Sequence, residues 1–171
     1  MSLDHIQNSI QQVIAYLTEH PDDARSTNAP ATAVIEEELR CRVEGPGGAN
    51  VVTDMPSAVG GGEAAPSPGW LSRAALASCD ATMIAMRAAQ EGVALTTLEV
   101  TVDSESDDRG LVGMDDSISP GPLSVRTRVR IGAAGIAPER LREIVEWAEA
   151  HSPVCDAIRR AVSTKVEVEI A

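Results

Sequence analysis

Hydrophobic residues recur along the chain with two different periods, and the period predicts where helices and strands form. Residues 3–19 place apolar side chains at helical spacing, with glutamine and asparagine between them. This predicts an amphipathic helix that ends at His20-Pro21, because a residue before proline disfavours the α conformation. The polar, proline-containing stretch 22–32 then predicts a linker. We expect an N-terminal helical extension over 1–24 and one domain over 25–171.

Alternation of apolar and charged residues predicts strands. The first runs from Ala33 to Val43 as one strand interrupted at Glu37, and the turn Gly45-Pro46-Gly47-Gly48 joins it to a second strand in a hairpin. Residues 56–69 are rich in glycine and proline and predict a loop. The predicted strands are 33–43, 50–53, 95–102, 123–131 and 165–170.

One strand carries a row of basic side chains. Arg126, Arg128 and Arg130 alternate with apolar residues over 123–131. The row could bind an anion. We favour the interpretation that it is the solvated face of an antiparallel strand, opposite acidic residues of a neighbour.

Proline-led caps predict three further helices. The most apolar begins at Ser67-Pro68 and runs to about Glu91, where Gly92 supplies a left-handed stop, so we expect it to be central and buried. Others begin at Ala137-Pro138 and at Ser152-Pro153. Helices and strands do not alternate as βαβ units, so the fold class is α+β.

Composition excludes several kinds of function. The chain has 171 residues, 26 acidic against 14 basic, a net charge of −12, and no phenylalanine. Nucleic acids and anionic membranes require clustered Lys and Arg, so neither is an expected partner. No apolar run reaches the roughly 18 residues of a membrane helix. The first thirty residues show no basic-then-apolar leader, and we expect a cytoplasmic protein.

Three cysteines leave thiol chemistry open. Cys155 falls at the third position of its helix, where exposed N–H groups should lower a thiol pKa. Cys79 lies mid-helix, where burial should raise the pKa unless a cation compensates, and such a cysteine is often only a small core residue. Cys41 is expected to be structural, on the inward face of its strand. Metal binding by Cys79, Cys155 and His151 has no support from their spacing, and His151 could instead cap the preceding helix.

Four segments, in order along the chain, carry a pattern of their own: residues 59–71 (VGGGEAAPSPGWL), 74–79 (AALASC), 108–116 (DRGLVGMDD) and 152–156 (SPVCD). Together they resemble the OsmC/Ohr family of osmotically induced and organic hydroperoxide resistance proteins. The resemblance implies an α+β OsmC-like fold, in which antiparallel sheets wrap long central helices in an intertwined homodimer. It also implies a thiol-dependent peroxidase that a dithiol reductant resets, without cofactor or metal.

In that family a helical cysteine is oxidised by peroxide to a sulfenic acid and a second cysteine resolves it to a disulfide, while an Arg and a Glu hold the first thiol as thiolate. Cys79 matches the attacking cysteine by position. The family's Glu is replaced by Gly69, and Ser152 stands where the resolving cysteine usually precedes Pro-Val. Cys155 is one helical turn later and is the candidate resolving thiol. Arg40, Arg42 or Arg109 could supply the cation.

The resemblance therefore favours a redox protein that reduces organic or hydrogen peroxides through Cys79, with Cys155 as its partner thiol. The alternative is a non-catalytic OsmC-fold protein that binds an apolar small molecule in the dimer cleft. Without phenylalanine, we expect Met, Leu and Trp70 to line that cleft. Ordinary core filling is the competing role for Met83, Met86 and Met114.

Overall fold

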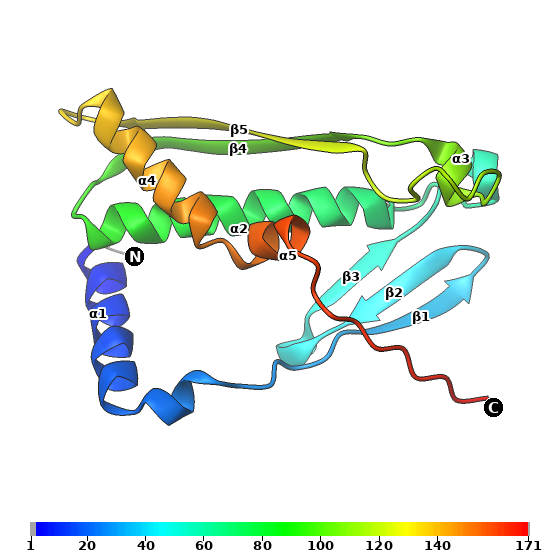
Figure 1. Ribbon diagram of the computed structural model, residues 1–171, viewed down its shortest axis with the longest axis horizontal. Coiled ribbons are helices and arrows are strands. Elements are labelled where there is room, and N and C mark those ends of the chain that lie inside the picture. The colour runs from blue at the N-terminus through cyan, green and yellow to red at the C-terminus, as the bar shows by residue number, and fades with distance from the viewer. Residues whose placement is uncertain (1–2, 171) are drawn as a thin grey trace.

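A computed structural model describes residues 3–170, and one long helix, α2, lies at its centre (Figure 1). The helices are α1 (Leu3–Glu19), α2 (Pro68–Gln90), α3 (Asp108–Leu111), α4 (Pro138–Ala150) and α5 (Pro153–Arg159). The strands are β1 (Thr32–Glu37), β2 (Arg40–Glu44), β3 (Asn50–Thr53), β4 (Leu95–Glu105) and β5 (Ser124–Ala133). Short 3₁₀ turns occupy Pro21–Ala24, Pro46–Gly48 and Ser57–Val59. The predicted α+β class is confirmed.

The first sheet is a three-stranded antiparallel meander in the order β1-β2-β3. The prediction of a single strand over 33–43 was wrong, because the chain reverses between β1 and β2. The charged interruption in the pattern marks this reversal: Glu38 adopts a left-handed φ of 48°, and Ile35 pairs with Cys41 across the turn. Leu39 therefore lies in the turn and is exposed, while Cys41 lies in β2 opposite Thr53.

The second sheet is the antiparallel pair β4–β5, which runs along α2 (Figure 1). Its basic row meets acidic side chains of β4, since Arg126 and Arg128 both pair with Asp103 and Arg130 approaches Glu99 at 3.5 Å. These arginines are mostly exposed. The interpretation of the row as a solvated, ion-paired strand face is confirmed.

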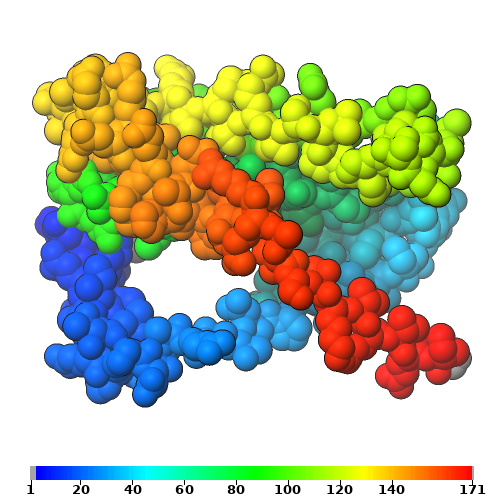
Figure 2. All heavy atoms as spheres, viewed as in Figure 1, coloured from blue at the N-terminus to red at the C-terminus, as the bar shows by residue number. Residues whose placement is uncertain are grey.

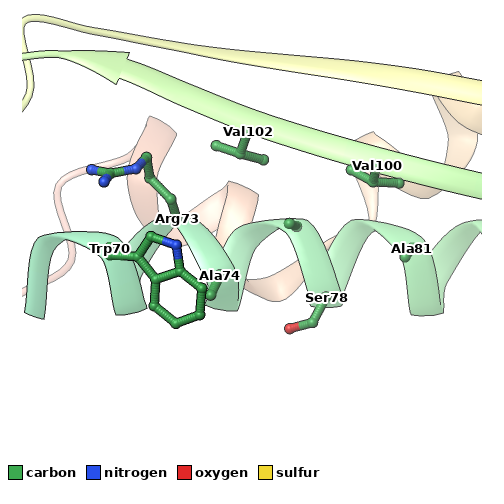
Figure 3. Close-up of a pocket in the computed structure, with 8 residues that line it drawn as sticks. Trp70, Arg73, Ala74, Ser78, Ala81, Val100 and Val102 are labelled. Carbon is green, nitrogen blue, oxygen red and sulfur yellow. The ribbon is translucent and has the colours of Figure 1, made fainter. Parts of the chain in front are cut away.

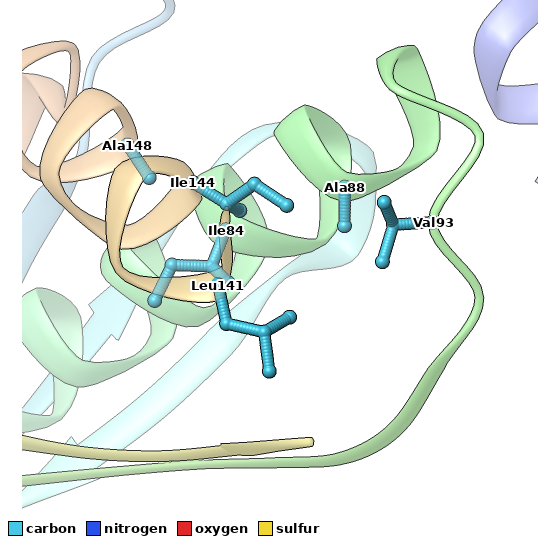
Figure 4. Close-up of a cluster of buried hydrophobic side chains, with 6 residues drawn as sticks. All are labelled: Ile84, Ala88, Val93, Leu141, Ile144 and Ala148. Atoms are coloured by element: carbon cyan, nitrogen blue, oxygen red, sulfur yellow. The ribbon is translucent and has the colours of Figure 1, made fainter. Parts of the chain in front are cut away.

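The central helix begins and ends as its sequence predicts. The Ser67 side chain accepts a hydrogen bond from the backbone N–H of Trp70, and Gly92 takes a left-handed φ of 70° just past the last turn. Only part of its circumference is covered: β4 lies on one side, and α4 and α5 on another. The buried core joins α2 to α4 near the helix's C-terminal end (Figure 4) and consists of Ile84, Ala88, Val93, Leu141, Ile144 and Ala148.

The N-terminal helix is held to the body at one end. The Gln7 side chain donates a hydrogen bond to the Gln90 carbonyl at 3.1 Å, yet α1 buries no residue. Figure 2 shows α1 and the following linker standing off from the rest of the chain with a gap between them. None of the described helices is both long and apolar enough to cross a membrane.

The prediction of a closing strand over 165–170 was also wrong for the single chain. The segment forms no strand and runs away from the body (Figures 1 and 2), with Val166, Val168 and Ile170 each more than three quarters exposed. A strand needs a neighbouring backbone to pair with. The segment therefore has the apolar alternation of a strand but pairs with none of the strands in residues 3–170.

Candidate functional site

Cys79 lies at the border between the covered and open sides of α2. Its helical neighbours Ala75 and Thr82 are exposed, Leu76 is buried, and Cys79 itself is half-buried. Cys79 therefore has solvent-exposed neighbours on one side and buried neighbours on the other. All three cysteines are free thiols.

Ser152 connects Cys79 to Cys155. Its side chain caps α5 by accepting the Cys155 backbone N–H at 3.3 Å, and the same hydroxyl donates to the Cys79 sulfur at 3.3 Å. Ser152 is fully buried. The serine that stands at the expected position of the resolving cysteine is thus in direct contact with the expected attacking cysteine, and Cys155 lies in the first turn of the helix that follows it.

Asp80 adds a buried carboxyl to this cluster. The residue is 3% exposed, and its Oδ1 has no hydrogen-bond partner among residues 3–170. Burial raises the pKa of Asp80; the nearby Ser152 hydroxyl and the positive charge of Arg159 act in the opposite direction, whereas the negative charge of Glu149 adds to the increase. A carboxyl with a raised pKa can take up and release a proton closer to neutral pH.

Cys155 does not behave as its helix position predicts. Burial raises the pKa of its thiol, and the charges of Asp80 and Glu149 and the Cys79 thiol add to the increase, while Arg159 opposes it. The expected lowering of the Cys155 pKa by a helix N-terminus was wrong, because desolvation of the thiolate outweighs it.

The other residues considered from the sequence lie elsewhere. Cys41 belongs to β2, in agreement with a structural role. The His151 ring lies 2.7 Å from the Trp147 carbonyl at the end of α4 and stacks on the Trp147 indole, so it caps that helix. Among the described residues, no three His, Cys, Asp or Glu side chains gather as a metal site.

The arginines named as candidate cations are occupied by other partners. Arg40 and Arg42 pair with Glu36, and Arg109 pairs with Asp107. Within residues 3–170, no arginine hydrogen-bonds to the Cys79 sulfur. The cation that acts on the thiol cluster is instead Arg159 of α5, itself paired with Glu149.

A groove of about 450 Å³ lies between α2 and β4 (Figure 3). It is lined by Trp70, Arg73, Ala74, Ala77, Ser78, Ala81, Val100 and Val102. Ala77 and Ala81 are each two positions from Cys79, so they lie on a different side of the helix. The groove is therefore apolar and separate from the thiol cluster.

The methionines do not line this groove. Trp70 does, as expected, but Met83 packs against the core cluster and Met114 is a largely exposed loop residue. Small alanine and valine side chains supply the apolar surface of this groove instead. Core filling is confirmed for Met83, and Met, Leu and Trp70 lining of the dimer cleft stays a prediction.

Comparison with known proteins places this arrangement in a family. The model of the family described as OsmC-like protein matches residues 60–167, which include both thiols, Asp80 and Ser152. The chain belongs to the OsmC-like protein family. A search of the curated proteins gives no match for this OsmC-like protein.

Solved structures share its fold. An OsmC like protein from Mycoplasma pneumoniae superposes with a TM-score of 0.66 at 13% identity, covering 79% of this chain and 89% of that chain. An organic hydroperoxide resistance protein OsmC from Legionella pneumophila gives 0.58 at 20% identity, with 79% and 91% covered. The organic hydroperoxide resistance protein OhrB of Bacillus subtilis gives 0.51 at 18%, with 78% and 91% covered. At these identities the likeness establishes the fold.

Sequence reasoning found the two thiols of the OsmC-like protein but missed the groups between and around them. Ser152 was identified as a helix cap, not as a contact of Cys79. Asp80 was not singled out, although a carboxyl directly after Cys79 on a largely apolar helix was a signal that could have identified it. Arg159 and Glu149 belong to no sequence motif, and only the packing of α4 and α5 shows that they lie near the thiols.

Proposed function

We propose that this OsmC-like protein reduces organic or hydrogen peroxides, with Cys79 as the attacking thiol and Cys155 as the resolving thiol. The observation that carries the proposal is the Ser152 hydroxyl, which donates to the Cys79 sulfur and caps the helix that contains Cys155 in its first turn. The thiol nucleophile of the reaction is thus held by a hydroxyl contact to the element that carries the second thiol. Structural neighbours described as organic hydroperoxide resistance proteins support the same reaction class.

The chemistry proceeds in two balanced steps. The Cys79 thiolate attacks one peroxide oxygen, the O–O bond breaks, and the alkoxide takes a proton and leaves as an alcohol; the sulfur becomes a sulfenic acid. Cys155 then displaces hydroxide from that sulfur, which forms the disulfide and releases water. An external dithiol reduces the disulfide. A reducing compartment such as the cytoplasm keeps the three free cysteines in the required state.

A second function has one observation in its favour. The apolar groove beside Trp70 could bind an apolar small molecule, and the OsmC fold would then serve as a binding protein whose cysteines are core residues. Gly69 in place of the family's Glu fits this reading. The two functions differ in whether Cys79 is consumed by peroxide.

The working form we propose is a homodimer. A second copy would cover three surfaces: the exposed apolar side chains of 165–170, the face of α1 that stands off from the rest of the chain (Figure 2), and the open side of α2. Extended segments of this pattern add to the edge of a sheet, and both sheets have open edges. A second chain would also close the open side of α2 beside Cys79.

Peroxide consumption tests the proposed reaction. Reduced protein is mixed with cumene hydroperoxide and dithiothreitol, and peroxide loss is followed for the wild type, Cys79→Ser, Cys155→Ser and the matched control Cys41→Ser. We expect turnover in the wild type and Cys41→Ser, none above background in Cys79→Ser, and an altered dependence on reductant in Cys155→Ser. Equal rates in the wild type and Cys79→Ser would favour the binding function.

A further inference from the structure

Asp80 is a buried carboxyl without a role in the two steps proposed above. It is next to Cys79 in the chain, is almost fully buried, and has an oxygen without a partner among the described residues. A buried polar atom left unpaired costs free energy. A carboxylate oxygen in this position can accept a proton at one stage of a reaction.

The groups around Asp80 connect it to both thiols. The Ser152 hydroxyl interacts with the Asp80 carboxyl and with the Cys79 sulfur, 3.3 Å away, and its oxygen accepts the Cys155 N–H. Asp80 and the Cys155 thiol also interact electrostatically inside the protein. The remaining charged groups acting on Asp80 are Glu149 of α4 and Arg159 of α5.

The second step of the reaction has a proton to move between the same two cysteines. Cys155 must lose its thiol proton, although burial favours the neutral thiol, and hydroxide must gain a proton as it leaves the Cys79 sulfenic acid. We infer that Asp80 and Ser152 form a proton relay that carries the Cys155 thiol proton to the hydroxide leaving Cys79. This inference rests on the proposed function.

The relay is balanced. Asp80 accepts the Cys155 proton as the sulfur–sulfur bond forms, Ser152 donates its hydroxyl proton to the departing hydroxide as the sulfur–oxygen bond breaks, and Asp80 returns a proton to Ser152. One water is released and no net proton is exchanged with solvent. The rate of this step is therefore independent of pH wherever Asp80 is ionised and Cys155 is a thiol.

The test separates the two steps by rapid mixing with one equivalent of cumene hydroperoxide in a Cys41→Ser background. Sulfenic acid is measured by trapping, and disulfide by loss of the second thiol, from pH 5 to 8. We expect Asp80→Asn to leave sulfenic acid formation unchanged and to slow disulfide formation about 100-fold at neutral pH. Its remaining disulfide formation should rise about tenfold per pH unit, because it then depends on the free Cys155 thiolate.

Variants distinguish a relay from a structural effect. Ser152→Ala should slow the disulfide step, and Ser152→Thr, which keeps a hydroxyl, should restore it. Asp54→Asn removes another buried carboxyl, one that accepts backbone N–H bonds in the loop before α2, and should alter neither step. A wild-type pH profile and rate retained in Asp80→Asn would overturn the relay while leaving the proposed function intact. Absence of Cys79 oxidation in the background protein would overturn both.

Discussion

At the scale of single residues, the site depends on one small side chain. Ser152 is a helix cap, a hydrogen-bond donor to Cys79 and a neighbour of Asp80 at the same time. A cysteine at this position would place a second thiol against Cys79 directly. The serine moves the second thiol one turn along α5 and leaves a hydroxyl at the contact.

Asp80 predicts a measurable dependence of stability on pH. The pKa of Asp80 is raised in the folded protein, so the folded state binds a proton at this carboxyl more tightly than the unfolded state does. As pH rises from the unfolded pKa through the folded pKa, the buried carboxyl ionises and the protein loses stability. We expect Asp80→Asn to be more stable than the wild type in urea unfolding at pH 7 to 8, with the advantage shrinking toward pH 4.

Asp54 predicts the opposite dependence of stability on pH. Backbone N–H donors, that of Ala64 first, lower the pKa of Asp54, so its ionised form stabilises the fold above the unfolded pKa and this contribution is lost as pH falls through the folded pKa. Asp54→Asn should therefore be less stable than the wild type at pH 7. If both variants were more stable than the wild type at pH 7, or both less stable, the environments assigned to Asp80 and Asp54 would be contradicted.

At the scale of elements, the fold depends on the contact between α2 and α4. Ile144 of α4 and Ile84 of α2 are fully buried in the same cluster (Figure 4), whereas most of the α2 side chains outside it are partly exposed. The stable part of the chain is therefore the end of α2 away from its N-terminal cap. The thiol cluster lies between this core and the open part of the helix.

This contact predicts a large and local loss of stability on truncation. Ile144→Ala should lower the free energy of unfolding by about 2–5 kcal/mol, since the surrounding side chains cannot fill the space left behind. Glu146→Ala on the exposed side of α4 is the control and should change it by less than about 0.5 kcal/mol. Urea unfolding at one protein concentration compares them. Similar losses in both variants would contradict the assigned core.

Most elements followed from the sequence, and the failures have physical causes. Helix starts at Ser67-Pro68 and Ser152-Pro153 were predictable because capping is local. The reversal at Glu38 was not, since no glycine or proline marks that turn. The two thiols followed from family resemblance, but the contact of Ser152 with Cys79 joins positions 73 residues apart and depends on how α5 packs.

At the scale of the whole molecule, the single chain leaves apolar surface uncovered. The segment 165–170 has the pattern of a strand but pairs with none of the described strands. Its acidic positions Glu167 and Glu169 alternate with the exposed valines, as in an edge strand with one polar face. In the proposed dimer, this segment would pair with a strand of the second copy.

The proposed homodimer predicts a molar mass near twice the 17.9 kDa of one chain. Light scattering after size-exclusion chromatography should show this value for the wild type. Deleting residues 165–171 should weaken the dimer, whereas Arg130→Ala on the solvated face of β5 should not. A monomeric wild type at micromolar concentration would contradict the dimer.

The central claim is that Cys79 is the thiol that reacts first with peroxide. The most direct measurement is mass spectrometry of reduced protein treated with less than one equivalent of cumene hydroperoxide and a sulfenic acid trap. The trap should be found on the peptide containing Cys79 in a Cys155→Ser background, with Cys41 unmodified. Modification of Cys41 at an equal rate, or no modification of Cys79, would contradict the account.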